Sequence, residues 1–291
     1  MKFSIITPCY NSAATIRDTF ESVLNQTFTD YEYIVVDGGS KDSTLDIIKE
    51  YEPKFNGRMR WISEPDNGIY DAVAKGFRMS SGEILTWLGS DDLLFSTAFA
   101  TVNEIYEKFP QVSWLIAEIC LVSEKNVFFD AVHSMTWSYR HFIAGAAFYV
   151  QQEGSFFKRS LWEQAGGKFS SLRWASDYEL WLRFSKLTTC YAVSALTAAF
   201  RMRSAGQASY ENAKAYTQEA MQAIKEHLKE ENIFRRLWFR LLRVVYSIPK
   251  IKNIILLAEK RFKIPEAAFV FDRTSQSWIL YKDYVKLCKS R

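Results

Sequence analysis

The chain has 291 residues and a formal net charge of +4, with 48% apolar and 24% charged residues. This composition is typical of a globular protein and excludes disordered and fibrous chains. A chain of this length can bury a sizeable core, in one large domain or in two small ones. The cysteines are scattered without metal or disulfide spacing, so we expect reduced thiols in a cytosolic protein. They are Cys9, Cys120, Cys190 and Cys288.

The sequence contains no long apolar segment. It opens with Met1-Lys2-Phe3-Ser4-Ile5-Ile6-Thr7-Pro8, in which the apolar stretch is too short for a signal peptide and predicts a first strand. No other stretch approaches the roughly 20 uncharged apolar residues that a membrane-spanning helix needs. We therefore expect a soluble or surface-bound protein.

Strand-like and helix-like segments alternate over the first 110 residues. The expected strands are residues 3–7, 33–37, 59–63 and 84–88, and the expected helices are residues 13–26, 43–51, 69–79 and 96–109. This alternation is typical of an α/β fold with a mostly parallel central sheet flanked by helices.

After residue 110 the alternation becomes irregular. The expected strands are residues 112–123, 126–129, 155–158, 189–193 and 196–201, and the expected helices are residues 177–186 and 210–231. The pattern divides the chain into an α/β domain of residues 1–205, with halves at about 1–110 and 111–205, and a helical, basic extension of residues 206–291.

A polar cluster follows each of the first four expected strands. The clusters are Thr7-Pro8-Cys9-Tyr10-Asn11, Asp37-Gly38-Gly39-Ser40-Lys41-Asp42, Glu64-Pro65-Asp66-Asn67-Gly68 and Ser90-Asp91-Asp92. The carboxyl ends of parallel strands meet at one edge of a sheet, where open α/β sheets bind ligands. We therefore expect these four loops to line one cleft.

Adjacent acids at positions 91 and 92 are the most informative of these clusters. Asp91 and Asp92 follow the apolar run of residues 84–88, and their charges repel unless something positive shares the site. Hard oxygen ligands suit Mg²⁺ or Mn²⁺, which often reach a protein together with a phosphate-bearing substrate. The structural alternative is a solvated helix N-cap, because Asp caps helices well.

The second cluster, Asp37-Gly38-Gly39-Ser40, ends a strand with an acid and two glycines. The acid could accept hydrogen bonds from a base or a ribose, and glycine lets a ligand approach the backbone closely. Neither the dinucleotide fingerprint nor the P-loop pattern is present. A tight turn in which Ser40 or Asp42 caps the next helix is the alternative. Tyr10 could stack on a nucleobase or pack beside the strand end.

Asp177 lies at the start of an expected helix. It could cap that helix, where the helix dipole stabilises a carboxylate. It could also be a base held over the cleft, and a carboxylate that removes a proton from an incoming hydroxyl typically accelerates a reaction about 10²–10⁴-fold. The residues alone leave both alternatives open.

Taken together, six motifs resemble those of family 2 glycosyltransferases, in the same order, from residue 2 to about residue 205. Four of them are the loop clusters above, of which the second and third extend to Val35–Thr44 and Glu64–Ala72. The other two are Gln152-Glu153-Gly154-Ser155-Phe156-Phe157 and Ala175-Ser176-Asp177-Tyr178-Glu179-Leu180-Trp181-Leu182-Arg183. Several spaced motifs in the correct order are specific to the family.

The resemblance implies a GT-A fold that binds a nucleotide-diphosphate sugar, with UDP as the expected nucleotide, and that transfers the sugar with inversion. Residues 1–110 would bind the nucleotide and residues 111–205 the acceptor. By this resemblance, Thr7, Pro8 and Tyr10 would border the base, and Asp37 would bind it with Gly38 and Ser40 alongside. Glu64, Asp66 and Asp71 would surround the nucleotide and sugar, and Asp91 would contact the ribose or sugar. Asp92 would bind Mg²⁺ or Mn²⁺, and Asp177 would be the general base. A single base without a second, nucleophilic carboxylate gives inversion, as in glycosidases.

Two positions depart from the family pattern. Ser90 stands where many members carry Asp, and Ala74 stands where Asn is common. A catalytically silent protein that binds nucleotide sugars is therefore one alternative. A sugar nucleotidyltransferase is another, but the first cluster lacks the Gly-rich signature with Arg and Lys that a triphosphate would need.

The extension carries a basic, apolar segment at residues 234–247. Arg236, Arg240, Arg243 and Ser247 would share one stripe of a helix, and nearly all other positions are apolar or aromatic. Lysines and an apolar run follow between residues 250 and 263. This pattern predicts an interfacial helix at an anionic membrane. The alternatives are a helix docked on the catalytic domain with its basic stripe in water, and a contact in a homo-oligomer.

Nucleic acid is an unlikely partner class because the arginines lie among bulky aliphatic residues rather than on an open polar face. The sequence thus predicts a cytoplasmic enzyme, peripheral at the inner face of the plasma membrane. Family analogy adds a lipid-linked saccharide as the acceptor, in the biosynthesis of a surface polysaccharide such as O-antigen, lipopolysaccharide or capsule.

Overall fold

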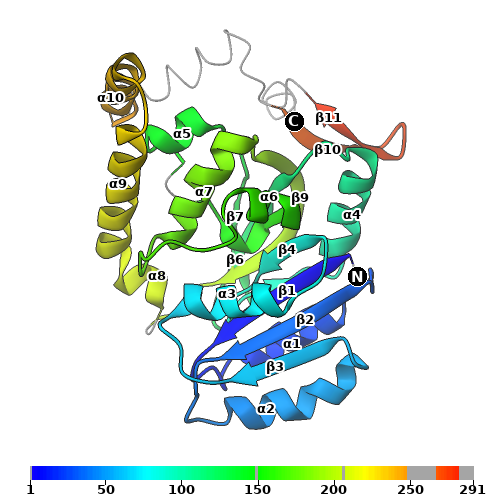
Figure 1. The fold of residues 1–291 in the computed structure, drawn as a ribbon. Helices are drawn as coiled ribbons and strands as arrows, with labels where there is room; N and C mark the ends of the chain where they lie inside the picture. Colours follow the sequence, from blue (N-terminus) through cyan, green and yellow to red (C-terminus); the bar gives the residue numbers. More distant parts are fainter. Residues whose placement is uncertain (1, 148–149, 205–206, 248–266, 282–291) are drawn as a thin grey trace.

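The computed structural model describes residues 2–147, 150–204, 207–247 and 267–281, in which one mixed sheet carries helices on both faces (Figure 1). Its strands are β1 (Phe3–Cys9), β2 (Tyr31–Asp37), β3 (Met59–Ser63), β4 (Ile84–Trp87), β5 (Leu93–Leu94), β6 (Trp114–Val122), β7 (Phe128–Val132), β8 (Ser155–Lys158), β9 (Tyr191–Arg201), β10 (Ala268–Asp272) and β11 (Ser277–Tyr281). The expected α/β fold with a mostly parallel sheet is confirmed.

The helices connect and cover these strands. They are α1 (Ile16–Leu24), α2 (Thr44–Tyr51), α3 (Ile69–Met79), α4 (Ala98–Lys108), α5 (Tyr139–Ile143), α6 (Arg159–Gln164), α7 (Ser176–Leu187), α8 (Ala208–Glu211), α9 (Ala213–Lys229) and α10 (Ile233–Ser247), with 3₁₀ turns η1 (Glu52–Phe55) and η2 (Gln152–Gly154). In the described part of the chain, none of these helices is both long and apolar enough to cross a bilayer.

The sheet order is β11-β10-β9-β6-β8-β4-β1-β2-β3. Strands β3, β2, β1 and β4 are parallel neighbours, so their carboxyl ends lie at one edge. Strand β8 is antiparallel to both of its neighbours, β4 and β6, whereas β6 and β9 are parallel to each other. The antiparallel insertion of β8 joins the regular first half to the irregular second half.

Alternating side chains of the parallel strands feed two separate cores. In β1, Phe3 and Ile5 pack with α1 and α4 on one face, whereas Ile6 packs with α3 and α7 on the other. The second core also contains Trp87, Trp114 and Trp181, whose rings stack at 5.0–5.5 Å between neighbouring centroids. Burying one such aromatic side chain contributes about 1.5–3 kcal/mol, so this cluster fixes α7 firmly against the sheet.

The extension differs from its prediction in two ways. Helix α9 packs on α7 and its buried residues, such as Ala220 and Ile224, belong to the second core. Residues 268–281 form a β-hairpin, so the prediction of a wholly helical extension is wrong for them. Strand β10 pairs in parallel with β9 through Ala268 and Phe269, which returns the chain to the sheet edge. The predicted basic residues between positions 250 and 263 lie outside the described residues.

Candidate functional site

The four polar loops meet at the carboxyl edge of the parallel strands, as the sequence predicts. The Asn11 backbone N–H donates to Ser40 Oγ at 2.7 Å, and Ser12 Oγ lies 2.8 Å from Ser90 Oγ. The Ser63 hydroxyl donates to Asp37 Oδ2 at 2.7 Å. The loops after β1, β2, β3 and β4 therefore form one connected surface.

Asp37 holds the turn after β2. Its Oδ2 atom accepts the backbone N–H groups of Gly39 and Ser40, both at 3.0 Å, and its Oδ1 atom accepts the Ser40 hydroxyl. The side chain is fully buried. The tight-turn alternative is thus present. The N-cap of α2 is Ser43, and Asp42 just before it accepts the Thr44 N–H at 3.0 Å. The role of Asp37 on a base stays a prediction.

Gly38 marks a narrow point between two predicted binding residues. A Cβ atom there would lie 2.6 Å from Asp66 Oδ2 and 3.5 Å from Tyr10 Cδ2, so any larger residue would displace the Asp66 carboxylate. Tyr10 is 61% exposed, which leaves its ring open to a stacking partner. Tyr10, Gly38 and Asp66 are therefore brought together on the open side of the loops.

The remaining predicted nucleotide residues are placed less directly. Thr7 is buried in β1 and its Oγ1 atom accepts the Tyr33 hydroxyl at 2.8 Å; Pro8 is buried beside it. Asp71, in the first turn of α3, accepts the Asn67 N–H at 3.0 Å, while exposed Glu64 pairs with Lys75 at 2.8 Å. Thr7 and Pro8 are therefore buried at the end of β1 and support the loop from inside the protein.

Asp91 and Asp92 fold over Gly89, with Asp92 buried and Asp91 partly exposed and paired with Arg203 at 3.5 Å. A Cβ atom on Gly89 would lie 2.6 Å from Asp92 Oδ2 and 3.1 Å from Asp91 Oδ1. Asp92 is only 3% exposed. Arg201, at the end of β9, donates its backbone N–H to Asp92 Oδ1 at 3.0 Å and its Nε to the Asp91 carbonyl at 2.8 Å. The solvated N-cap alternative does not describe this turn.

The ionised form of Asp92 is disfavoured in the acidic turn of Asp91 and Asp92. The pKa of Asp92 is raised well above its usual range by burial and then by the charges of Glu153 and Asp91. Among the described residues, no three His, Cys, Asp or Glu side chains form a ready metal cage. Divalent Mg²⁺ usually takes one or two carboxylates and completes its shell with substrate phosphates and water, so this turn fits such an ion.

Asp177 is buried at the second position of α7, and the N-cap of that helix is Ala175. Its Oδ1 atom accepts the Tyr178 N–H at 2.7 Å. Burial raises the pKa of Asp177 to about 6, against the lowering effect of that N–H and of the Tyr70 and Tyr216 hydroxyls. Asp177 is therefore not the simple helix cap of the alternative hypothesis, and it titrates near neutral pH, as a general base should.

Glu153 is a buried acid to which the sequence analysis gave no role. It lies in η2, is 6% exposed, and its pKa is raised to about 7, chiefly by burial and also by Asp91 and Asp177. Its place depends on Gly154, where a Cβ atom would lie 2.5 Å from the Ala117 carbonyl oxygen. In the sequence, the sign of this position is the Glu153-Gly154 pair directly before an expected strand. Glu153 links the acidic turn electrostatically with Asp177.

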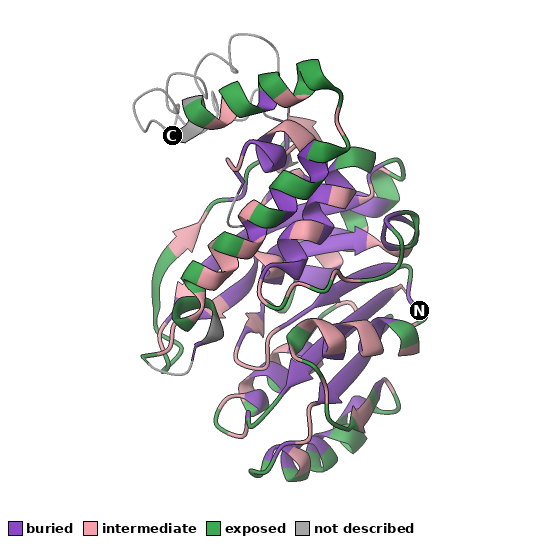
Figure 2. Ribbon diagram, turned by 60° about the vertical axis from the view of Figure 1, so that its left-hand side comes forward, coloured by how far each residue is buried: buried purple, intermediate pink, exposed green. Residues whose placement is uncertain are grey.

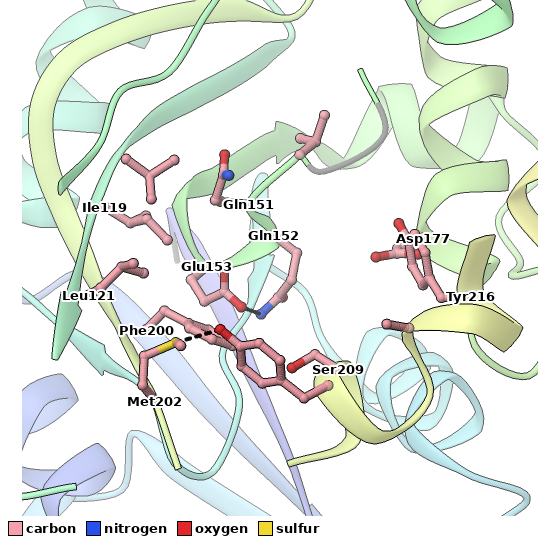
Figure 3. Close-up of a pocket in the computed structure, with 14 residues that line it drawn as sticks. Ile119, Leu121, Gln151, Gln152, Glu153, Asp177, Phe200, Met202, Ser209 and Tyr216 are labelled. Carbon is pink, nitrogen blue, oxygen red and sulfur yellow. Dashed lines mark hydrogen bonds between the residues drawn. The ribbon is translucent and has the colours of Figure 1, made fainter. Parts of the chain in front are cut away.

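A cavity of about 450 Å³ opens beside these acids (Figure 3). Glu153 and Asp177 line it, together with Gln152 and Tyr216. In Figure 3, Ile119, Leu121, Phe200 and Met202 lie opposite Asp177 and Tyr216, with Glu153 and Gln152 between the two groups. Its volume is in the range of small-molecule sites.

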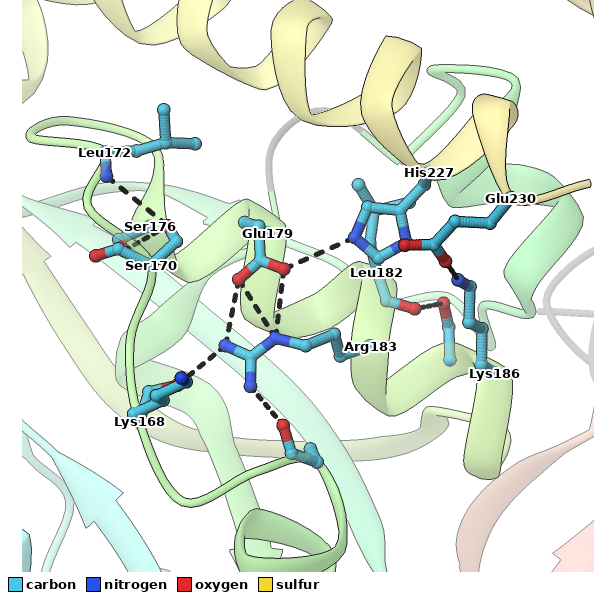
Figure 4. Close-up of polar contacts among 12 residues, drawn as sticks. Lys168, Ser170, Leu172, Ser176, Glu179, Leu182, Arg183, Lys186, His227 and Glu230 are labelled. Carbon is cyan, nitrogen blue, oxygen red and sulfur yellow. Dashed lines mark hydrogen bonds and ion pairs between the residues drawn. The ribbon is translucent and has the colours of Figure 1, made fainter.

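Helix α9 anchors the segment that carries Asp177. Glu219 accepts the backbone N–H groups of Trp174 and Ala175 at 2.7 and 3.0 Å, just before α7 begins. Figure 4 shows a second link, in which Glu179 pairs with Arg183 at 2.8 Å and with His227 of α9 at 3.3 Å. The pKa of Glu179 is lowered because these partners outweigh its burial.

Known proteins resemble this chain in sequence and in fold. The family model for glycosyl transferase family 2 matches residues 4–116. A Mycobacterium tuberculosis protein named as a PGL/p-HBAD biosynthesis glycosyltransferase is 41% identical over 93 residues, which are 32% of this chain and 36% of that protein. The chain thus aligns with about a third of the length of that relative.

Two solved structures have the same fold at 18% sequence identity. S. aureus TarS 1-349, in complex with UDP-GlcNAc, has a TM-score of 0.67 over 85% of this chain and 73% of its own. The mannosyltransferase PcManGT from Pyrobaculum calidifontis, in complex with GDP-Man and Mn²⁺, has a TM-score of 0.61 over 88% and 74%. These similarities identify the fold as GT-A-like.

A longer sequence alignment shows the family to which the chain belongs. An uncharacterised glycosyltransferase of Mycobacterium tuberculosis is 32% identical over 185 residues, covering 62% of this chain and 67% of that protein. Combined with the family model and the acids at the strand ends, this similarity leads to one conclusion: the chain belongs to glycosyl transferase family 2.

Proposed function

We propose that the protein transfers a sugar, with inversion, from a nucleotide-diphosphate sugar to a hydroxyl group of a saccharide acceptor. The observation that carries the proposal is Asp177, a buried carboxylate with a pKa of about 6 that lines a cavity beside the acidic turn. A base of this kind is ionised at neutral pH and still basic enough to take a proton.

In the proposed reaction, the acceptor oxygen attacks the anomeric carbon as the bond to the diphosphate breaks. Asp177 takes the proton of the attacking hydroxyl, and the nucleoside diphosphate departs with the bonding electrons. One displacement inverts the anomeric configuration, since no enzyme carboxylate replaces the leaving group first.

The acidic turn would hold a divalent cation, Mg²⁺ or Mn²⁺, through Asp92. Such an ion, when bound, neutralises charge on the departing diphosphate. Asp91 would contact the ribose or the sugar. Arg201 supports both acids through its backbone N–H and its guanidinium group.

The nucleotide would occupy the open side of the four loops, with its base against the exposed ring of Tyr10. UDP is the proposed nucleotide, in keeping with the UDP-GlcNAc bound to TarS. Asp37, Gly38, Ser40 and Asp66 form the turns against which the base and ribose would lie, with Glu64 and Asp71 at the rim.

Helix α10 supports a membrane-surface location for the enzyme, with a lipid-linked acceptor in surface-polysaccharide biosynthesis. Its outward face carries apolar side chains that are more than half exposed: Ile233, Phe234, Leu237, Trp238 and Leu241. Figure 2 shows the exposed surface along this helix, with one buried turn against the protein. At 100° per residue, Arg235 and Arg240 flank the apolar face on its two edges.

Helix α10 docks on the second core through Phe239 and Leu242, while the apolar side chains of its outward face stay exposed. Arg236 donates from Nε to the Glu231 carbonyl at 2.6 Å, and Arg243 contacts Met221 Sδ at 3.1 Å, so these two arginines lie toward the protein. An apolar face in water with cationic edges is what an interfacial helix presents to anionic lipid. We therefore propose the inner face of the plasma membrane as the site of action.

The test is metal-dependent turnover of nucleotide sugars without an acceptor. Purified protein is incubated with UDP-sugars and Mn²⁺ or Mg²⁺, and release of UDP is measured before and after EDTA. We expect hydrolysis that EDTA abolishes and added Mn²⁺ restores, and that Asp92→Asn reduces at least about 100-fold. The matched control is Asp130→Asn, which changes an exposed Asp on β7. A protein that binds UDP-sugars but never releases UDP would be the silent binder of the alternative hypothesis.

A further inference from the structure

The two sides of the cavity beside Asp177 differ in chemical character. Asp177 lies at one end with Tyr216, and Glu153 lies between that end and the other (Figure 3). Each acid is less than a tenth exposed, and Gln152 donates to Glu153 Oε1 at 2.7 Å. Leu121, Phe200 and Met202 form the other end, opposite Asp177 (Figure 3).

The apolar side is built into the sheet rather than left by a loose surface. Leu121 is in β6 and Phe200 is opposite it in β9, in parallel register. Ile119, on the same face of β6, is almost fully buried. The Tyr210 hydroxyl contacts Met202 Sδ at 3.0 Å, which fixes the Met202 side chain in the wall. The wall therefore has a defined shape.

A fully hydroxylated sugar is a poor match for such a wall. A hydroxymethyl group directed at Leu121, Phe200 and Met202 would lose water and find no hydrogen-bond partner on these side chains, which is costly. A sugar that carries a methyl group or an ether in place of a hydroxyl avoids this loss and gains apolar contact. The acidic end remains suited to the hydroxyls that react or are read by Glu153.

We propose that this cavity selects a deoxygenated or O-methylated sugar as the acceptor unit, with its reacting hydroxyl at Asp177 and its apolar face on Leu121, Phe200 and Met202. The proposal rests on the proposed transferase function and names its acceptor class. Glu153 accepts a hydrogen bond from a second acceptor hydroxyl and so sets the orientation of the ring.

The test uses pairs of methyl glycosides that differ only at C5, one with a methyl group and one with a hydroxymethyl group. The gluco, galacto and manno series are compared in the presence of UDP and Mn²⁺. Saturation-transfer NMR gives the affinities, and the protons that contact the protein. We expect the 6-deoxy member of at least one pair to bind about tenfold more tightly, with strongest saturation at its methyl protons.

Variants connect the preference with the wall. Met202→Gln keeps the length of the side chain and an acceptor for Tyr210, yet makes the wall polar, so we expect the preference to fall at least about threefold. Leu121→Thr, which suits a strand, should act in the same direction. The control is Met135→Gln, which changes an exposed methionine that does not line the cavity.

The outcomes separate this proposal from the one on which it rests. Metal-dependent UDP release without any 6-deoxy preference would overturn the acceptor class and leave the transferase function standing. An unchanged preference in both wall variants would also overturn it, as would an absence of binding by every glycoside. Absence of UDP release from all donors would instead remove the transferase function.

Discussion

Asp177 meets two opposing physical demands. Burial raises its pKa from 3.8 to about 6, so the ionised form that the reaction needs is less favourable in the fold than in the unfolded chain. The folded protein binds the Asp177 proton more tightly than the unfolded chain does. Its contribution to stability is therefore full below the unfolded pKa and is lost as the pH rises through about 6, by roughly 3 kcal/mol.

Replacing this carboxylate should separate activity from stability. Asp177→Asn keeps an oxygen for the Tyr178 N–H but cannot take a proton, so transfer should fall at least about 100-fold. The melting temperature at pH 7 should stay equal or rise, because an ionised group leaves a buried site. Kinetics and thermal unfolding of the same preparation check both. A variant with near-normal turnover would show that Asp177 is not the base.

The pH dependence of transfer follows from the same group. We expect kcat/KM to fall about tenfold per pH unit below pH 6 and to be level above it, because only ionised Asp177 accepts a proton. The groups facing Asp177 are the Tyr70 and Tyr216 hydroxyls and Glu153, and the two hydroxyls lower its pKa. Rates from pH 5 to 8, with the fold monitored by circular dichroism, test this. A flat profile down to pH 5 would contradict it.

Residue types and spacing predicted that Asp91, Asp92 and Asp177 lie at the ends of expected elements. The roles of these residues came from the family resemblance and stay predictions. The same motifs did not show that Thr7 bonds to Tyr33 or that Asp37 accepts from its own turn, since these partners depend on register between strands. The place of Glu153 in the site follows only from its burial in the folded protein. Burial beside Asp177 is a property of the assembled fold.

Helix α9 is the element through which the extension reaches the site. Glu219→Ala removes the acceptor for the Trp174 and Ala175 N–H groups, so transfer should fall about tenfold and stability by about 1–3 kcal/mol. Glu219→Gln keeps an acceptor oxygen and should restore much of kcat without changing KM for the donor. Glu226→Ala, in an exposed position of the same helix, is the control. Equal kcat in the Ala and Gln variants would show that the loop needs no such anchor.

Helix α10 yields a prediction about lipid. The double variant Leu237→Gln, Leu241→Gln should bind vesicles of phosphatidylglycerol and phosphatidylcholine at least about tenfold more weakly than the wild type, since each leucine contributes about 1.5–3 kcal/mol when buried. Co-sedimentation measures the partition. Leu187→Gln changes an exposed leucine at the end of α7 and should bind normally. Wild-type protein that ignores the anionic vesicles would contradict the proposed location.

Local patterns recovered most elements of the first half. The helix expected at residues 69–79 has the bounds of α3, and the short strands differ by a few residues. The hairpin of β10 and β11 was missed because its stabilising partner is β9, about 75 residues earlier in the chain. Strands 189–193 and 196–201 are one strand, in which irregular pairing with β6 passes through the polar interruption.

Across the whole molecule, the alternation of strands and helices predicted the layers, and the two cores explain why. Each parallel strand sends successive side chains to opposite faces, so both faces need a covering layer. The antiparallel place of β8 between β4 and β6 could not be predicted, because no turn or spacing in the sequence specifies which strands become neighbours.

The hairpin has a practical consequence for anyone who shortens the chain. Phe269 is fully buried and its ring lies 4.8 Å from that of Phe109, centroid to centroid. Cutting the protein after α10 would therefore bare an aromatic surface and remove the strand that pairs with β9 at positions 192 and 193. Open strand margins recruit other chains. A trimmed version would be prone to self-association, and the final residues are best kept in any preparation meant for crystals or assays.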